Sequence, residues 1–214
     1  MHFLPQDIDD YTLAHSQQEP ELLYALQRET WQKILNPRMV SGAYQGRVLS
    51  MLSKLIQPSY VLEIGTYTGY SAICLAEGLS QEGKLITLDV NEEIQWLARK
   101  YFDKSGFGAQ IESRIGPALD IIPELDSGID LVFIDADKEN YSKYFDLVVP
   151  KMRKGGIILS DNVLWSGKVV EKLNPKDFST KALLAYNKKL VEDPRVETVL
   201  LPLRDGLTVS RIVS

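Results

Sequence analysis

The stretch "SYVLEIGTYTGYS" (59–71) begins as a strand and ends as a helix. Its first half is rich in apolar and β-branched residues, as in a strand from the interior of a sheet. Gly65 and Gly69 then bracket a turn. Glycine permits both a tight turn and the close approach of a ligand to the backbone. The stretch therefore predicts the strand–turn–helix unit of an α/β protein.

Outward from this unit, strand and helix patterns alternate to the C-terminus. The further predicted strands are 84–90, 111–116, 129–136, 155–162, 196–203 and 206–213. Alternation predicts a mostly parallel sheet with helices on both faces, and the hairpin signal "RDG" before the last strand adds one antiparallel edge strand. Residues 1–55 show helical spacing of apolar residues. We expect a single domain, 1–214, with 1–55 as a helical extension packed on it.

The composition excludes several functional classes. A net charge of −5 over 214 residues argues against a nucleic-acid-binding surface, which needs a basic stripe. No apolar run approaches the ~20 residues of a membrane-spanning helix, and the start "MHFLPQDIDDYT" lacks the pattern of a signal peptide. Cys74 is the one cysteine, lies in an apolar run, and is expected to be a buried, inert thiol. These features predict a cytoplasmic protein.

The stretch "LVFIDADKEN" (131–140) changes abruptly from apolar to charged. Burying a carboxylate is costly unless it is paired. In a doubly wound sheet, however, ligands bind beyond the carboxyl ends of the strands. Asp135, Asp137 and Lys138 are therefore expected at the ligand-binding edge, with Asn140 as a candidate N-cap of the next helix.

The first two strands predict a nucleoside-containing cofactor. Asp89 ends the second strand, where a carboxylate can accept hydrogen bonds from two ribose hydroxyls. Tyr67 stands where a dinucleotide-binding G-x-G would require glycine, and Glu63 suits a cationic ligand better than a pyrophosphate. S-adenosylmethionine (SAM) carries a sulfonium and no phosphate, so it is preferred. The alternative is an NAD-dependent oxidoreductase on the same fold.

A metal site is predicted where the fourth and fifth strands end. Asp161 and Asn162 end the fifth strand, and neighbouring strand ends would place Asp135 close to them. Two carboxylates and an amide oxygen form an oxygen-only set that favours Mg²⁺, with Mn²⁺ or Ca²⁺ as alternatives, and disfavours zinc. The simpler interpretation is that Asp161 and Asn162 only cap the following loop.

Six motifs together resemble the cation-dependent O-methyltransferases, the caffeoyl-CoA and catechol O-methyltransferase group. They are "MVS…QG…LSMLSKLI", "VLEIGTYTGYS", "LDVNEE", "GPAL", "FIDADKENY" and "DNVLWSG". The resemblance runs from about residue 36 to the C-terminus. It implies a Rossmann-like SAM-dependent methyltransferase with a seven-stranded sheet, and a homodimer.

The resemblance also implies roles for individual residues. The residues expected to contact SAM are Met39, Val40, Ser41, Glu63, Gly65, Thr66, Ser71, Asp89, Ala118, Asp135 and Asp137. Among them, Ser41 and Asp137 match contacts to the methionine portion, Asp89 to the ribose and Ala118 to the adenine. Asp135, Asp161 and Asn162 match the metal ligands. Lys138 matches the general base of the catechol enzymes, so Lys138 and Asp135 are the expected catalytic residues.

The expected substrate is a vicinal diphenol of the catechol, hydroxycinnamate or flavonoid type. Both of its oxygens would bind the metal, which would lower the pKa of the reacting hydroxyl. Trp165 is expected to wall the aromatic pocket, and Ser166 matches a substrate-contacting position. The segment after "DNVLWSG" lacks the Arg- and Tyr-rich cluster that meets CoA in the plant enzymes, which argues against an acyl-CoA substrate. A methyltransferase acting on a non-catechol or protein substrate, or a non-catalytic scaffold dimer, are the remaining alternatives.

Overall fold

The structure is a computed structural model that describes residues 5–214. The chain divides into two compact units, Pro5–Pro117 and Ala118–Ser214. Within the described residues, no helix has the length and apolar character needed to cross a membrane. Residues 1–4 of the expected N-terminal extension lie outside the described part of the chain.

Seven strands form one sheet in the order β3-β2-β1-β4-β5-β7-β6. Their bounds are β1 Tyr60–Ile64, β2 Lys84–Asp89, β3 Ile111–Ile115, β4 Ile129–Ile134, β5 Met152–Asp161, β6 Val196–Leu201 and β7 Leu207–Ile212. The predicted α/β class and mostly parallel sheet are confirmed. The antiparallel edge is the predicted hairpin, in which β7 pairs with β5 and β6 lies outermost.

The helices follow the predicted alternation with the strands. Their bounds are α1 Gln6–Ala14, α2 Glu21–Lys33, α3 Ala43–Ile56, α4 Tyr70–Ala76, α5 Gln95–Ser105, α6 Ala118–Ile121, α7 Tyr141–Val148 and α8 Phe178–Glu192. The stretch "YSKYFDLVVPKM" predicts a helix over 141–152. Helix α7 ends earlier, at Val148, because Pro150 lies in a short 3₁₀ turn that follows it. Met152 already belongs to β5, so that strand is longer than its apolar core.

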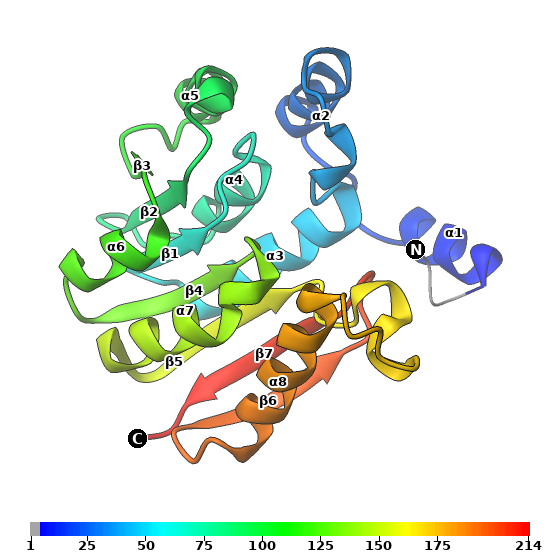
Figure 1. The fold of residues 1–214 in the computed structure, drawn as a ribbon. Helices are drawn as coiled ribbons and strands as arrows, with labels where there is room; N and C mark the ends of the chain where they lie inside the picture. Colours follow the sequence, from blue (N-terminus) through cyan, green and yellow to red (C-terminus); the bar gives the residue numbers. More distant parts are fainter. Residues whose placement is uncertain (1–4) are drawn as a thin grey trace. The chain divides into compact units, whose positions relative to one another are not determined.

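In the unit Pro5–Pro117, three parallel strands carry the core (Figure 1). All five residues of β1 are buried, including Glu63. β1 pairs in parallel with β2, and β2 with β3. The stretch "NEEIQWLARKYFDKSG" predicts a helix with a glycine stop. Helix α5 does end where Gly106 adopts a left-handed φ of 82°. This unit contains the strand–turn–helix stretch 59–71, whose strand is β1.

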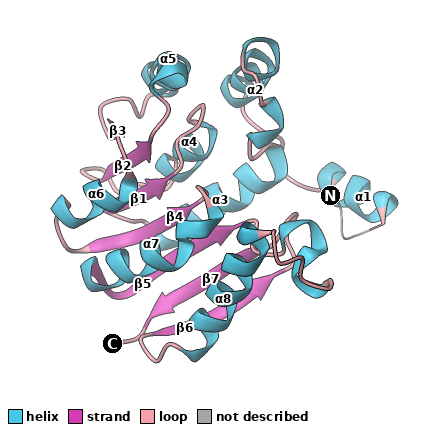
Figure 2. Ribbon diagram, viewed as in Figure 1, coloured by secondary structure: helices cyan, strands magenta, loops and turns pink. Residues whose placement is uncertain are grey.

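In the unit Ala118–Ser214, helices α7 and α8 pack beside one another and against the strands (Figure 2). All six residues of β4 are buried. The core between the helices is aromatic, with Tyr186 of α8 in edge-to-face contact with Tyr141 and Phe145 of α7. β4 and β5 run parallel with Ile134 opposite Ser160. That register decides which side chains meet where the two strands end.

Candidate active site

The turn after β1 needs glycine at both ends. Gly65 has a φ of 109° and Gly69 a φ of 85°. Residues other than glycine rarely adopt such positive φ values. A Cβ atom on Gly69 would also lie 2.5 Å from the ring of Phe102. The turn is closed by a hydrogen bond from the Gly69 N–H to the Thr66 carbonyl (2.8 Å). The predicted glycine turn is therefore present, and close packing adds a second reason for Gly69.

Glu63 and Thr66 are joined through a residue that the sequence reasoning missed. The Thr87 hydroxyl donates to Glu63 Oε2 (2.5 Å) and lies 2.6 Å from the Thr66 hydroxyl. A hydroxyl has one proton, so Thr66 donates to Thr87. All three side chains are buried. The sequence gives no clear signal for Thr87, because residues 85–88 of β2 are all buried and Glu63 lies on a different strand.

The Asp89 carboxylate is held by two backbone N–H groups. Tyr67 donates to one oxygen (2.6 Å) and Asn91 to the other (2.8 Å). Tyr67 has a left-handed φ of 48°, which aims its N–H at the carboxylate. A carboxylate oxygen has two lone pairs, so each oxygen can accept one further bond. The side chain is only partly buried, and this arrangement suits the predicted ribose contact.

The other predicted SAM contacts in this unit differ in exposure. Met39 is 60% exposed, whereas Val40, Ser41 and Ser71 are buried. Met39 to Ser41 lie just before α3, and Ser71 lies in the first turn of α4. Eight of the predicted contacts thus fall in Pro5–Pro117, namely Met39, Val40, Ser41, Glu63, Gly65, Thr66, Ser71 and Asp89. The remaining three, Ala118, Asp135 and Asp137, belong to Ala118–Ser214.

The ends of β4 and β5 bring two of the three predicted metal ligands, Asp135 and Asn162, to one place. Ile134 pairs with Ser160, so the next residues, Asp135 and Asp161, follow at matching positions. The Nζ of Lys138 lies 3.1 Å from Asp135 Oδ1 and 2.8 Å from Asn162 Oδ1. These oxygens therefore converge on a cation, here the lysine ammonium.

The chemistry of this set fits a hard divalent cation, which takes carboxylate and carbonyl oxygens as ligands. Across residues 5–214, no three His, Cys, Asp or Glu side chains gather in a group that could hold a metal. The predicted set, Asp135, Asp161 and Asn162, has only two such residues and takes its third oxygen from an amide. Its assignment as a metal site stays a prediction.

Tyr141 forms a hydrogen bond with the Lys138 side chain, and this role was not predicted from the sequence. Its hydroxyl accepts from Lys138 Nζ (2.5 Å) and donates to the Asp161 carbonyl (3.0 Å). Burial, and then the negative charges of Asp135 and Asp161, raise the pKa of Tyr141 well above its usual value. The phenol therefore stays neutral and keeps donating. Its signal in the sequence was an aromatic residue three positions after a charged one at the start of a helix.

Asp137 is exposed and already has two side-chain partners. Tyr144 donates to one carboxylate oxygen and the Asn140 amide to the other. Asn140 does occupy the position before α7, but its side chain makes no capping hydrogen bond. The predicted capping bond is absent, because the Asn140 side-chain oxygen accepts from Lys143 Nζ (2.9 Å) instead. The predicted contact of Asp137 with SAM stays a prediction.

The loop after β5 has an unusual backbone. Asn162, Trp165 and Ser166 have φ values of 59°, 48° and 57°, in the left-handed region that costs energy for such residues. Asp205 holds this conformation by accepting from the Ser166 N–H through its carboxylate and from the Leu164 N–H through its carbonyl. Strain that persists under such restraint is typical of functional sites.

The strained loop places Trp165 near the lysine. Lys138 Nζ lies 5.8 Å from the centroid of the Trp165 ring, within the range of a cation–π contact. This position is compatible with the predicted aromatic wall. The roles of Trp165 and Ser166 toward a substrate stay predictions.

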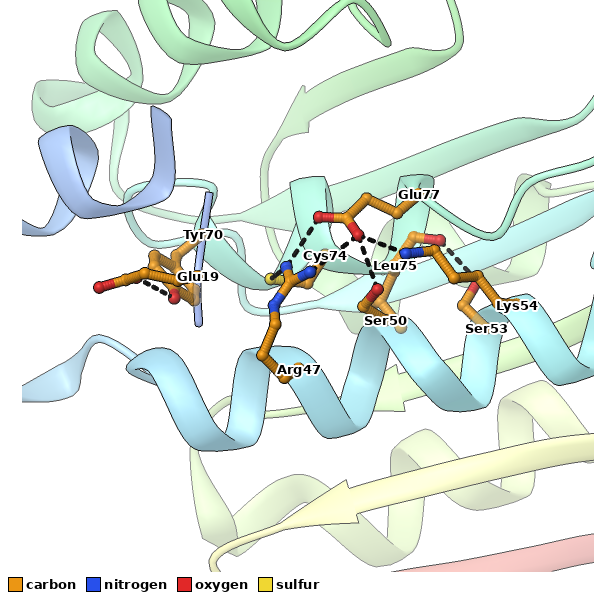
Figure 3. A network of polar contacts seen from close by, with 9 residues as sticks. All are labelled: Glu19, Arg47, Ser50, Ser53, Lys54, Tyr70, Cys74, Leu75 and Glu77. Carbon is orange, nitrogen blue, oxygen red and sulfur yellow. Dashed lines mark hydrogen bonds and ion pairs between the residues drawn. The ribbon is translucent and has the colours of Figure 1, made fainter. Parts of the chain in front are cut away.

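A second ion cluster, the Glu77 cluster (Arg47, Ser50, Lys54 and Glu77), joins α3 to the end of α4 (Figure 3). Arg47 donates two bonds to the Glu77 carboxylate, at 3.0 and 2.7 Å. Cys74 lies beside this cluster, fully buried, and burial raises the pKa of its thiol to about 12. The predicted burial of Cys74 is confirmed, and its inertness stays a prediction.

Comparisons with known proteins agree with this geometry. The O-methyltransferase family profile matches residues 13–213. A caffeoyl-CoA O-methyltransferase from Arabidopsis thaliana is 36% identical over 97% of this chain and 85% of its own length.

Solved structures are similar as well. A methyltransferase from Podospora anserina bound to S-adenosylhomocysteine (SAH) superposes with a TM-score of 0.89, with 28% identity and full coverage of both chains. An O-methyltransferase from Streptomyces achromogenes in complex with SAM has a TM-score of 0.87 and 28% identity, over 97% of this chain and 96% of that one.

The family match overturns the alternative of an NAD-dependent oxidoreductase. It covers nearly the whole chain, including the glycine turn, the strand ends at Asp135 and Asp161, and the strained loop. The chain belongs to the O-methyltransferase family, and it is an enzyme that methylates oxygen atoms.

Proposed function

We propose that this enzyme transfers the methyl group of SAM to one hydroxyl of a vicinal diphenol and depends on a divalent cation. The observation that carries the proposal is the convergence of Asp135 Oδ1 and Asn162 Oδ1 on the buried Lys138 ammonium. It places two oxygens of the proposed metal set and a basic side chain at one sheet edge. The SAM and SAH complexes of the similar structures support the choice of cofactor.

The residues of the chain divide the work between binding and proton transfer. SAM, when bound, supplies the methyl group, with Asp89 accepting from its ribose and Glu63 providing a buried negative charge for its cationic end. A divalent cation on Asp135, Asp161 and Asn162 would supply the positive charge that lowers the pKa of a phenol hydroxyl.

Lys138 is placed to take part in removing the phenol proton, with Tyr141 fixing the position of its Nζ. Methyl transfer then leaves a methyl ether and SAH. Holding the phenol in contact with the cofactor supplies most of the rate enhancement. The face of Trp165 would orient the aromatic ring of the substrate.

The test is methyl transfer from labelled SAM to a panel of vicinal diphenols, with Mg²⁺ and with a chelator. We expect transfer only where both the metal and two adjacent hydroxyls are present. The panel includes catechol, a hydroxycinnamate and a flavonoid. It also includes caffeoyl-CoA, because two relatives at 36–37% identity are caffeoyl-CoA O-methyltransferases. Monophenols serve as matched controls. Undiminished transfer in chelator would contradict the metal, and transfer to monophenols would contradict the substrate class.

We also propose that the enzyme is a cytoplasmic homodimer, as the family resemblance implies. Sedimentation equilibrium at micromolar concentration should give twice the chain mass of 24.2 kDa. A single species at the monomer mass, with activity intact, would contradict the dimer.

A further inference from the structure

The Lys138 side chain uses the same oxygens that the proposed function assigns to a metal. Its Nζ lies 2.8 Å from Asn162 Oδ1 and 3.1 Å from Asp135 Oδ1. Both are hydrogen-bond distances. The side chain is 7% exposed, so this contact is a buried ion pair and not a solvated one. The inference below rests on the proposed function, because only there are Asp135 and Asn162 metal ligands.

An ammonium and a divalent cation cannot share these oxygens without a large repulsion. A divalent cation would lie about 2.0–2.6 Å from the ligand oxygens. It would then be only a few ångströms from an ammonium bonded to the same atoms. Like charges at that range repel strongly where solvent is excluded. The ammonium therefore opposes binding of the cation as long as it stays on Asp135 and Asn162.

In the same position the ammonium also makes contacts that use neither oxygen. The Tyr141 hydroxyl accepts from Nζ at 2.5 Å while donating its own proton to the Asp161 carbonyl. The Trp165 ring lies 5.8 Å away and the Tyr141 ring 4.7 Å away, both within cation–π range. Lys138 can thus leave the two oxygens and still remain in the site.

We propose that Lys138 is an internal counter-cation for the metal site. Its ammonium neutralises the Asp135–Asn162 oxygens until a divalent cation binds, and the cation then displaces it from these two oxygens, while its contacts with Tyr141 and Trp165 keep it in the site. Lys138 is accordingly a competitor for the metal as well as a catalytic residue.

The test measures cation binding directly by isothermal titration calorimetry with Mn²⁺, in the presence of SAH and without any phenol. Lys138→Met should bind Mn²⁺ at least about 10-fold more tightly than the wild type, because the competing charge is gone. Lys143→Met is the matched control. Lys143 is exposed, bonds to Asn140, and carries the same charge on the neighbouring helix. Its loss should change the affinity by less than about 2-fold, since solvent screens it.

Lys138→Gln is a second variant, because its amide can still bond to Asp135 and Tyr141 if the methionine variant folds poorly. Near-ultraviolet circular dichroism and SAH affinity report on folding independently of the metal. Unchanged or weaker Mn²⁺ binding in a folded variant overturns the inference, since Lys138 would then be neutral toward the metal or would help to hold it. So does an equal gain in Lys143→Met, which would indicate a general charge effect.

The same titration separates this inference from the proposed function. Binding to the wild type without a gain in the Lys138 variants contradicts only the inference. Binding to the Lys138 variants but not to the wild type supports the inference and contradicts a metal-dependent wild-type enzyme. Absence of binding to every folded protein overturns both.

Discussion

Two ion clusters, the Glu77 cluster in one unit and the cluster around Lys138 in the other, are built with opposite polarity. In the Glu77 cluster a carboxylate is surrounded by donors from α3, and in the cluster around Lys138 an ammonium is surrounded by oxygen acceptors. The donors of the first cluster can serve only an anion. The oxygens of the second can serve an ammonium or bind a metal ion.

This difference separates a structural contact from a site that can exchange its ligand. Glu77 has four hydrogen bonds from three side chains, which holds α3 against α4. Lys138 depends on a strained loop for one of its partners, because Asn162 has a left-handed φ. We therefore expect substitutions in the first cluster to lower stability and substitutions in the second to lower activity.

Asp161→Ala should have the largest effect, and on activity. Loss of a carboxylate from the proposed metal set should lower kcat/KM by at least about 1,000-fold, or about 4 kcal/mol of transition-state stabilisation. SAH affinity, measured by calorimetry, should change by less than about 3-fold, because the Asp89 carboxylate and its backbone partners are unaffected. Normal turnover of this variant in chelator would contradict the functional role given to the cluster around Lys138.

Arg47→Met should have the next largest effect, and on stability. It leaves the Glu77 carboxylate with only Ser50 and Lys54, and losing one partner of a largely buried ion pair costs about 3 kcal/mol. Urea denaturation measures the loss. The kcat of the folded variant should stay within about 2-fold of the wild type. A fall in kcat without a loss of stability would mean that this cluster also serves the reaction.

The pH dependence of stability should sharpen the comparison. Burial alone would raise the pKa of Glu77, but hydrogen bonds from Arg47, Lys54 and Ser50 lower it from 4.5 to about 2. A depressed carboxyl pKa stabilises the fold fully above the unfolded value, and that contribution is lost as pH falls from 4.5 toward 2. Glu77→Gln should lose this part of the acid-induced decline in urea midpoint. An unchanged slope would assign the decline to other carboxyls.

The smallest effect is expected for Lys188→Met. Its ion pair with Glu192 is exposed at both ends and 3.8 Å long, and such pairs contribute less than about 0.5 kcal/mol. The same urea measurement applies. A loss comparable to that of Arg47→Met would mean that burial does not distinguish these pairs, and the comparison would fail.

Local sequence was sufficient for much of this architecture. The 59–71 stretch predicted the strand, the glycine turn and the helix, because left-handed φ values at Gly65 and Gly69 are a local backbone requirement. The acids after β4 and β5 were placed at one sheet edge because parallel strands end together. The end of α7 was missed, since Pro150 acts within a pattern that otherwise continues to Met152.

The partners of the charged groups were not predictable in the same way. Nothing near Glu63 in the sequence points to Thr87, and nothing near Glu77 points to Arg47. Each of these bonds depends on which elements pack together and in which register.

The sequence by itself determined the fold class, the glycine turn, the position of the acids at strand ends, and the family. These depend on short-range backbone preferences and on the order of elements along the chain. Only the tertiary structure decided that Lys138 lies between Asp135 and Asn162 on the Tyr141 hydroxyl. The physical reason is that hydrogen bonds and ion pairs act over about 3 Å, whereas the residues that make them are brought within that distance only when the strands and helices pack.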